Sequence, residues 1–365
     1  MRLILRLSLL LGVIAGRLPA ADSTAPRIDF ETYNPKSMLV VPEHPLTRAK
    51  FPFIDVHNHQ RDFRSQDLPA LLRQMDELNM TTMVNLSGGS GTFLSAAAAR
   101  IKTAAPSRLL VFANVTFVGF GREDWTEKAV AALVADHAAG ARGLKFFKNF
   151  GMTTKDQNGR RIPIDDPRMD PIWAKCGELG IPVLIHTGEP RSFWDPMDEN
   201  NERWLELITH PGRRQSESGP GFEQLIREQH AVFRRHPKTT FIAAHFDWHA
   251  NDLTKLGAFL DEMPNVNVET GAIIAELGRQ PRAARKFFER YQDRILFGKD
   301  SWVPSEYATY FRIFETEDEY FPYHKKYHAF WPMYGMGLPD AVLKKIYYKN
   351  ALRIIPGIDR SLFPE

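Results

Sequence analysis

Eight short apolar runs rich in β-branched and aromatic residues recur along the sequence, and segments with helical hydrophobic periodicity separate them. Such alternation is typical of βα units that build a parallel sheet. The runs that we expect to form strands are residues 51–56, 81–86, 109–116, 141–147, 181–187, 240–245, 266–270 and 294–298. Eight units in one chain predict a single α/β domain closed into a (β/α)8 TIM barrel.

The segments between the runs predict helices. They are residues 68–78, 95–104, 124–138, 172–179, 221–235, 253–261 and 283–291. A doubly wound dinucleotide-binding fold is the main alternative for such a pattern. No glycine-rich fingerprint follows the first run, and this favours the barrel.

Three long segments, residues 148–167, 188–220 and 301–338, each follow a predicted strand. In a barrel this places them as long loops on the C-terminal face, where barrels carry their active sites. The segment 301–338 contains twelve aromatic residues. This density favours core packing of a long loop over a platform for sugar or aryl rings.

The amino terminus has the pattern of a Sec-type signal peptide. Arg2 and Arg6 flank an apolar run that is followed by small residues before Asp22. A membrane anchor is the alternative, but the run is shorter than the ~20 residues of a spanning helix, and no other stretch is apolar enough. We therefore expect an exported protein, periplasmic or secreted. The predicted organisation is a signal peptide at 1–20, an extended lead-in at 21–50, the barrel at 51–356 and a C-terminal tail at 357–365.

Composition argues against several roles. The sequence has 43% hydrophobic and 25% charged residues, which is the balance of a soluble globular protein. Residues 1–20 hold three arginines and no acidic residue, so their removal lowers the formal net charge from +3 to zero. A nucleic-acid-binding role then loses its compositional support. Cys176 is the only cysteine, so a transition-metal site must be built from histidines and carboxylates, and no internal disulfide can form.

The first run continues into Asp55-Val56-His57-Asn58-His59. Residues two apart share one face of a strand, so Asp55, His57 and His59 are predicted to point to one side, at the barrel mouth. Two imidazoles so spaced can chelate one divalent ion, and Asp55 can orient a ring nitrogen. Taken alone, this pattern more often describes two exposed histidines at a strand end.

His186, His245 and Asp300 close the fifth, sixth and eighth predicted strands in the same register. Together with His57 and His59 they converge at the mouth of an apolar barrel, where each would need a polar partner. The convergence favours a metal site over the exposed-histidine interpretation.

Six motifs carry a resemblance to a known family. They are DVHNH at 55–59, GLKFFK at 143–148, IPVLIH at 181–186, FIAAH at 241–245, ELGRQP at 276–281 and ILFGKD at 295–300. With them, residues 51–356 resemble the amidohydrolase superfamily, and within it the amidohydrolase-related branch of aminocarboxymuconate-semialdehyde decarboxylase-like, metal-dependent TIM-barrel hydrolases. The motifs are specific to the superfamily but not to a substrate. The sequence departs from this branch at Lys299, where Thr is common. Strand alternation points Lys299 away from Asp300, so the departure affects a substrate contact rather than the metal ligand.

The resemblance implies a divalent ion, most often zinc, bound by His57, His59, His186 and Asp300, with a water in the open position. Manganese or another divalent metal is the alternative. The resemblance also implies that His245 acts as an acid or base. Asp300 could serve as ligand and proton acceptor together.

Lys145 decides between one metal ion and two. In binuclear members of the superfamily a carboxylated lysine on the fourth strand bridges two ions, and Lys145 lies on the fourth predicted strand. His245 could then bind the second ion. The alternative is an unmodified lysine that neutralises Asp55 or Asp300. We favour this alternative and therefore one ion.

Four residues are predicted to contact the substrate: Arg61, Lys148, Arg191 and Trp302. Arg191 follows His186 closely enough to clamp a carboxylate, although a solvated loop arginine fits this position equally well. Further rim residues that could contact a substrate are Gln60, Asn149, Glu189 and Trp194.

Three functions fit this predicted site. The first is a hydrolase that uses a metal-activated water on an amide, ester or lactone of a small molecule. The second is a metal-dependent decarboxylase or lyase of an unsaturated or aromatic carboxylic acid, with Arg61 or Arg191 holding the carboxylate. The third is a non-catalytic exported binding protein, which a spare His245 disfavours. We expect a small-molecule substrate, no nucleic acid and no stable membrane insertion after signal removal, and the chain could form a homodimer.

Overall fold

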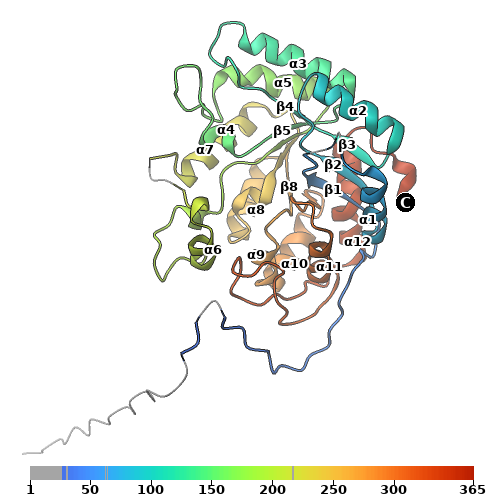
Figure 1. Cartoon of the computed structure of the whole chain (residues 1–365), viewed down its shortest axis with the longest axis vertical. Helices are drawn as coiled ribbons and strands as arrows, with labels where there is room; N and C mark the ends of the chain where they lie inside the picture. The colour runs from blue at the N-terminus through green and yellow to red at the C-terminus, as the bar shows by residue number, and fades with distance from the viewer. Residues whose placement is uncertain (1–26, 30–31, 62, 64, 216–217) are drawn as a thin grey trace, which may run out of the picture. The chain divides into compact units, whose positions relative to one another are not determined.

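The structure, a computed structural model, describes residues 27–29, 32–61, 63, 65–215 and 218–365 (Figure 1). The predicted signal peptide lies outside these residues. The chain divides into two units, Met1–Val40 and Val41–Glu365. In its described part, the first unit has neither helix nor strand. No helix in the described ranges has both the length and the apolar character needed to cross a membrane.

Nine short strands in the described part of the second unit account for the eight predicted ones. They are β1 (Phe53–Asn58), β2 (Met80–Asn85), β3 (Leu109–Val111), β4 (Ala113–Asn114), β5 (Leu144–Phe146), β6 (Val183–Ile185), β7 (Phe241–Ala243), β8 (Val266–Glu269) and β9 (Ile295–Leu296). All pair in parallel, in the orders β1-β2-β3 and β4-β5-β6-β7-β8-β9. The predicted strand 109–116 is split in two at Phe112.

Backbone hydrogen bonds join the two ladders at both ends. At the first junction the Phe112 amide donates to the Asn85 carbonyl at 3.0 Å. At the second, the Val56 amide donates to the Phe297 carbonyl at 3.0 Å, and the Asp300 amide donates to the His57 carbonyl at 2.7 Å. The last strand therefore meets the first, as the predicted (β/α)8 barrel requires.

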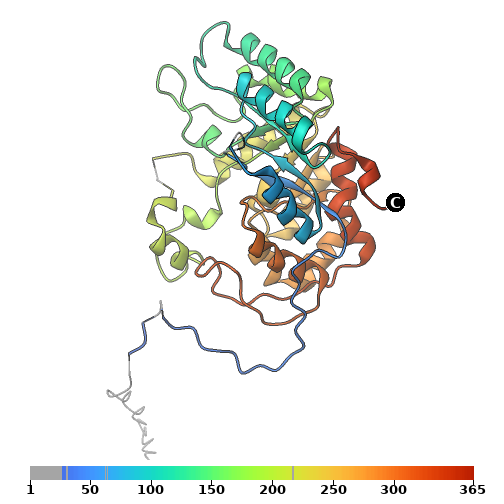
Figure 2. The ribbon, with the colours of Figure 1, turned by 45° about the vertical axis from the view of Figure 1, so that its right-hand side comes forward.

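The seven predicted helices are all present, with ends that differ by a few residues. They are α1 (Leu68–Leu78), α2 (Thr92–Ala104), α3 (Trp125–Ala139), α5 (Asp170–Leu179), α7 (Phe222–Arg235), α8 (Leu253–Glu262) and α10 (Pro281–Arg290). Helix α1 begins where the Asp67 carboxylate accepts the Ala70 amide, and it ends at Asn79 in the left-handed conformation. Figures 1 and 2 show the helices around the outside of the strands.

Several helical segments were not predicted. They are α4 (Asn149–Met152), α6 (Trp204–Thr209), α9 (Ile274–Gly278), α11 (Tyr307–Glu315), and a C-terminal run of α12 (Asp340–Lys344), a π-helical segment (Lys345–Lys349) and α13 (Asn350–Ile354). Helix α11 lies in the segment predicted to be a long aromatic loop. Its Tyr307, Tyr310, Phe311 and Phe314 are buried and surround Phe297, which confirms core packing for these aromatic residues.

Gly298, two residues after the end of β9, leaves room for the residues at the barrel mouth. A Cβ atom at this position would lie 2.2 Å from Oε2 of Glu269 and 2.9 Å from Cβ of His57. The Glu269 carboxylate cannot easily move away, because its Oε2 accepts the Gly271 amide at 2.6 Å. Any larger residue therefore overpacks this point of the barrel.

We expect Gly298→Ala to lower the free energy of unfolding by about 1–3 kcal/mol, because the added methyl group forces Glu269 and His57 apart. Urea unfolding followed by circular dichroism measures the change. The control is Gly212→Ala, where the new Cβ meets no atom within 4 Å. Equal stability of the two variants would contradict the expected overpacking.

Candidate metal centre

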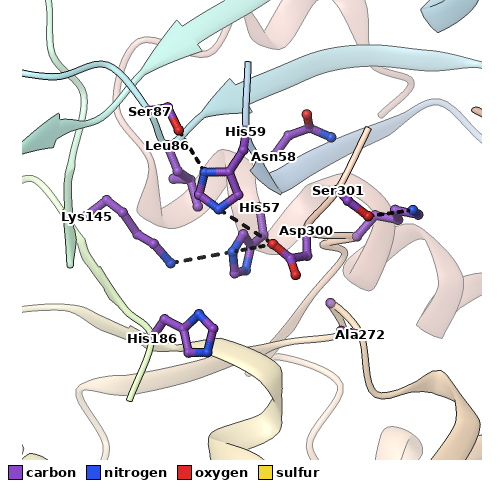
Figure 3. A network of polar contacts seen from close by, with 12 residues as sticks. His57, Asn58, His59, Leu86, Ser87, Lys145, His186, Ala272, Asp300 and Ser301 are labelled. Carbon is purple, nitrogen blue, oxygen red and sulfur yellow. Dashed lines mark hydrogen bonds and ion pairs between the residues drawn. The ribbon is translucent and has the colours of Figure 1, made fainter. Parts of the chain in front are cut away.

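Three ligand atoms converge where the last strand meets the first. The Nε2 atom of His57 lies 3.5 Å from Oδ1 of Asp300, and Nε2 of His59 lies 3.6 Å from the same oxygen (Figure 3). These separations exceed those of good hydrogen bonds. They are close to the spacing of two ligands on one ion when each metal–ligand bond is about 2.1 Å long. These three groups form a cluster that could hold a metal ion.

The outward-facing ring nitrogens of both histidines have partners of their own. The Nδ1 of His57 lies 2.9 Å from Oε1 of Glu269, and the Nδ1 of His59 lies 2.9 Å from the hydroxyl oxygen of Ser87. Such contacts fix the ring orientation of metal-binding histidines and leave Nε2 to face the ion. The donor set of imidazoles and one carboxylate suits zinc and related divalent ions.

Burial keeps these imidazoles neutral, which is the form that binds metal. Desolvation and the charge of Lys145 lower the pKa of His59 to about 3 and hold that of His57 well below its usual value. For Asp300, burial raises the pKa, but the neighbouring histidines and Lys145 outweigh this and hold it below the ordinary value. The centre therefore offers an ionised carboxylate beside neutral rings.

His186, the fourth predicted ligand, lies below His57 in Figure 3, outside the tight cluster of ligand atoms. Its Nδ1 lies 3.3 Å from Nε2 of His245, and Nδ1 of His245 lies 2.8 Å from the carbonyl oxygen of Gly271. A carbonyl only accepts, so Nδ1 of His245 carries the proton and its Nε2 accepts from His186. The Nε2 of His186 is then an unprotonated nitrogen, and it is buried without a hydrogen-bond partner among the described residues. This chain of contacts leaves His186 ready to bind an ion.

Glu269 was missed by the sequence analysis, and the role predicted for Asp55 was wrong. Asp55 accepts the backbone amides of His57 and Lys299 and the hydroxyl of Tyr307, and it touches no imidazole nitrogen. The register of β1 shifts after Asp55, which defeats the simple alternation used to predict its direction. Glu269 contacts His57 instead. Its position at the end of β8 was the available signal, since the other site residues also end strands.

Lys145 reaches the same centre from β5, the fourth predicted strand. Its side chain is buried, and Nζ lies 3.5 Å from Nε2 of His57 (Figure 3). Burial lowers the pKa of Lys145 to about 7, although the charges of Asp300 and Glu269 act in the opposite direction. The carboxylates that face this lysine are therefore Asp300 and Glu269, and Asp55 is not among them.

His245 stands on a left-handed turn that follows β7. Four consecutive residues, His245, Phe246, Asp247 and Trp248, have φ angles between +54° and +58°. This conformation costs non-glycine residues roughly 1–2 kcal/mol each and persists only where the surroundings hold it.

The buried carboxylate of Asp247 holds this turn. It accepts a hydrogen bond from the side-chain amide of Gln229 and lies 2.8 Å from Nε2 of His230 and 3.1 Å from Nδ1 of His249. Burial raises the pKa of Asp247, but the two histidines outweigh this effect and hold the pKa below its ordinary value. The carboxylate is therefore ionised. The result is that the ring of Trp248 stacks on that of His245 at 4.5 Å.

Two of the four residues predicted to contact the substrate, Arg61 and Lys148, lie near the candidate metal ligands. Arg61 is exposed and close enough to His59 to affect its pKa, and it has no hydrogen bond or ion pair within the described residues. Lys148 acts in the same way on the pKa of His186 and forms an ion pair with Glu189.

The other two predicted contacts lie against different partners. Arg191 is largely exposed and lies 3.8 Å from the carboxylate of Asp195. The indole nitrogen of Trp302 donates to the side chain of Gln74 on α1 at 3.3 Å. The structure brings neither of them into contact with the ligand cluster.

Comparisons with known proteins agree with this architecture. A putative amidohydrolase from Staphylococcus aureus shares 14% identity with a TM-score of 0.51, covering 83% of this chain and 99% of its own. A dihydroxybenzoic acid decarboxylase from Polaromonas sp. JS666, solved with bound manganese and an inhibitor, also shares 14% identity with a TM-score of 0.51, covering 86% and 99%. At this identity the likeness concerns the fold. No curated protein sequence matches significantly. The sequence profile of the family described as Amidohydrolase matches residues 54–357, and the chain therefore belongs to this family of metal-dependent enzymes.

Proposed function

We propose that the chain is a hydrolase that acts on an amide, ester or lactone with one divalent ion, zinc, held by His57, His59, His186 and Asp300. The observation that carries the proposal is the convergence of two neutral Nε2 atoms on the Asp300 carboxylate. An ion at this position supplies Lewis-acid chemistry, because it polarises a carbonyl group and makes a water molecule more acidic. Export and a homodimer stay proposals that rest on the sequence alone.

Asp300 is the proton acceptor in this proposal. Its side chain is 36% exposed, whereas that of His57 is fully buried, so a water molecule can reach the carboxylate. The lowered pKa keeps the carboxylate ionised and able to accept a proton from the attacking water. The same group later returns the proton to the leaving atom.

His245 acts through His186 in this arrangement. Its Nε2 accepts from Nδ1 of His186, and its side chain is 1% exposed, so it orients a ligand and has little access to solvent. Partners of this kind typically contribute 10- to 100-fold to metal affinity.

Decarboxylation is the second candidate, and Arg61 is the observation that favours it. An exposed guanidinium near His59 without an ion-pair partner in the described residues could hold the carboxylate of an acidic substrate. The hydrolase is preferred because Asp300 already provides the proton acceptor that hydrolysis needs.

We expect about one zinc ion per chain in protein purified without added metal, since the proposed centre has one set of four ligands. Inductively coupled plasma mass spectrometry measures the content. His186→Ala should lose the ion, whereas His137→Ala, on helix α3, should retain it. Two ions per chain would make Lys145 and His245 ligands. A folded native protein that takes up no metal even after reconstitution would refute the proposed centre.

The variant His245→Asn separates two roles for this residue, which are the orientation of His186 and proton transfer with the substrate. Asparagine tolerates the left-handed backbone and removes Nε2. We expect metal affinity to fall 10- to 100-fold, because His186 loses its orienting partner. Competition with a chromogenic chelator gives the dissociation constant. Unchanged metal affinity with a reduced kcat would instead assign His245 to proton transfer with the substrate.

Hydrolysis is tested on uncharged lactones and esters, with acid release followed by a pH indicator. We expect turnover by the native enzyme and a decrease in kcat of about 10²- to 10⁴-fold in Asp300→Asn, which removes the proton acceptor. The control Asp340→Asn alters an exposed carboxylate paired with Lys50 and should retain activity. Release of carbon dioxide from hydroxylated benzoates, without lactone or ester hydrolysis, would replace the hydrolase by the decarboxylase.

A further inference from the structure

Asp300 has a backbone conformation that needs support. Its φ angle is +86°, in the left-handed region. Aspartate tolerates this region better than most residues, but it stays there only where its surroundings hold it. On the N-terminal side, the Asp300 amide donates to the His57 carbonyl at 2.7 Å, and the Lys299 amide donates to Oδ1 of Asp55 at 3.2 Å. These contacts fix the chain as far as Asp300, and the residue that follows needs a support of its own.

The side chain of Lys299 supplies this support. Its ammonium group donates to the hydroxyl of Ser301 at 3.1 Å, so the side chains on either side of Asp300 are joined to each other. Within the ranges that the structure describes, this is the one hydrogen bond of the Ser301 hydroxyl. Figure 3 shows Ser301 beside Asp300 at the edge of the centre. The lysine therefore closes a small ring around Asp300 and restricts its backbone on both sides.

Glu306 holds the lysine in place. The Lys299 ammonium group forms an ion pair with Oε2 of Glu306, the last residue of a short 3₁₀ helix (Pro304–Glu306) that precedes α11. The side chain of Lys299 is 1% exposed and that of Glu306 is 16% exposed. Shielding from water strengthens hydrogen bonds that involve charged groups. The same burial keeps a substrate away from Lys299, so the substrate contact predicted at this position is wrong.

Glu306 has two further neighbours from the segment 301–338. Nε2 of His324 lies 3.5 Å from its Oε2, and Nζ of Lys325 lies 3.7 Å from the same oxygen. In the described part of the chain, Lys299 alone joins this carboxylate to Ser301. Replacing Lys299 therefore breaks the link to Ser301 while Glu306 keeps a cationic neighbour, which lowers the cost of the substitution.

We propose that Lys299 is a positioning residue, whose bridge between Glu306 and Ser301 holds Asp300 in the left-handed conformation and directs its carboxylate at the neighbouring imidazoles. The inference rests on the proposed function, because Asp300 is a ligand only in the proposed metal centre. The backbone conformation does not need the ion. It can therefore be tested in the metal-free chain.

Two variants break the bridge. Ser301→Ala removes the hydroxyl group and leaves every charge in place, so it tests the bridge even if the second variant does not fold. Lys299→Met keeps most of the length of the side chain without its ammonium group. The matched control is Arg312→Met, which removes a cation 2.7 Å from the buried Asp318 carboxylate. Asp318 keeps His44 as a neighbour, as Glu306 keeps Lys325.

Hydrogen exchange in the metal-free full-length chain measures the conformation directly. Mass spectrometry with electron-transfer fragmentation assigns the exchange of the Asp300 amide. We expect this amide to exchange at least about tenfold faster in both bridge variants, because a hydrogen bond to a charged group contributes about this factor. In Arg312→Met it should exchange as in the native chain. Native exchange rates in the bridge variants that fold would overturn the inference.

Cobalt binding shows whether the position of Asp300 matters to the centre. The visible absorption of bound Co²⁺ depends on its ligands, and competition with a chelator gives the dissociation constant. We expect the bridge variants to bind Co²⁺ about 10- to 100-fold more weakly and with an altered spectrum, whereas Arg312→Met keeps the native affinity and spectrum. A bridge variant that is less stable but keeps both native values would reduce Lys299 to a purely structural role and overturn the inference.

The two measurements separate this inference from the proposed reaction. A native chain that takes up no metal would refute the proposed centre, and hydrogen exchange in the metal-free chain would still decide whether Lys299 holds Asp300. Native metal affinity and exchange in the variants would refute the role of Lys299 and leave the proposed hydrolase intact.

Discussion

One buried carboxylate organises the mouth of the barrel. Oε1 of Glu269 lies 2.9 Å from Nδ1 of His57 and accepts the backbone amide of His245 at 2.7 Å, while Oε2 accepts the Gly271 amide. These contacts tie the ends of β1, β7 and β8 to one side chain. A fully buried carboxylate is tolerated only when its oxygens accept hydrogen bonds in this way. The position of the His57 ring, the left-handed turn at His245 and the lack of a side chain at Gly298 therefore depend on one another.

The parts of the fold that follow from periodicity could be predicted, and those set by tertiary contacts could not. Strand ends are marked by a sharp change from apolar to polar residues, and in the structure His186 directly follows β6 while Asp300 bridges Asn58 at the end of β1. Glu269 shares this position but gives no distinctive pattern, because a carboxylate at a strand end is ordinary. Helix α11 was missed although its apolar residues follow a helical period, because the segment 301–338 was interpreted as one long aromatic loop. The turn after β7 carries no glycine or asparagine, the usual signal for left-handed backbone.

Charge is divided between two regions of the rim. The centre combines a buried lysine, neutral imidazoles and an ionised aspartate. Arg61, which has no ion-pair partner among the described residues, lies close to it. By contrast, a pocket of about 260 Å³ beside Trp248 is lined by acids and arginines that neutralise one another.

The left-handed turn has a consequence for how the centre opens and closes. Its four residues are held by Gln229 and His230, both of which belong to helix α7. If the middle of α7 opens locally, Asp247 loses two of its partners and the left-handed backbone is held less firmly. The contact between His245 and His186 depends on this backbone and would be lost with it. We therefore expect the hydrogen-exchange protection of the centre to be limited by the local opening of α7, an element on the outside of the barrel, rather than by unfolding of the whole protein.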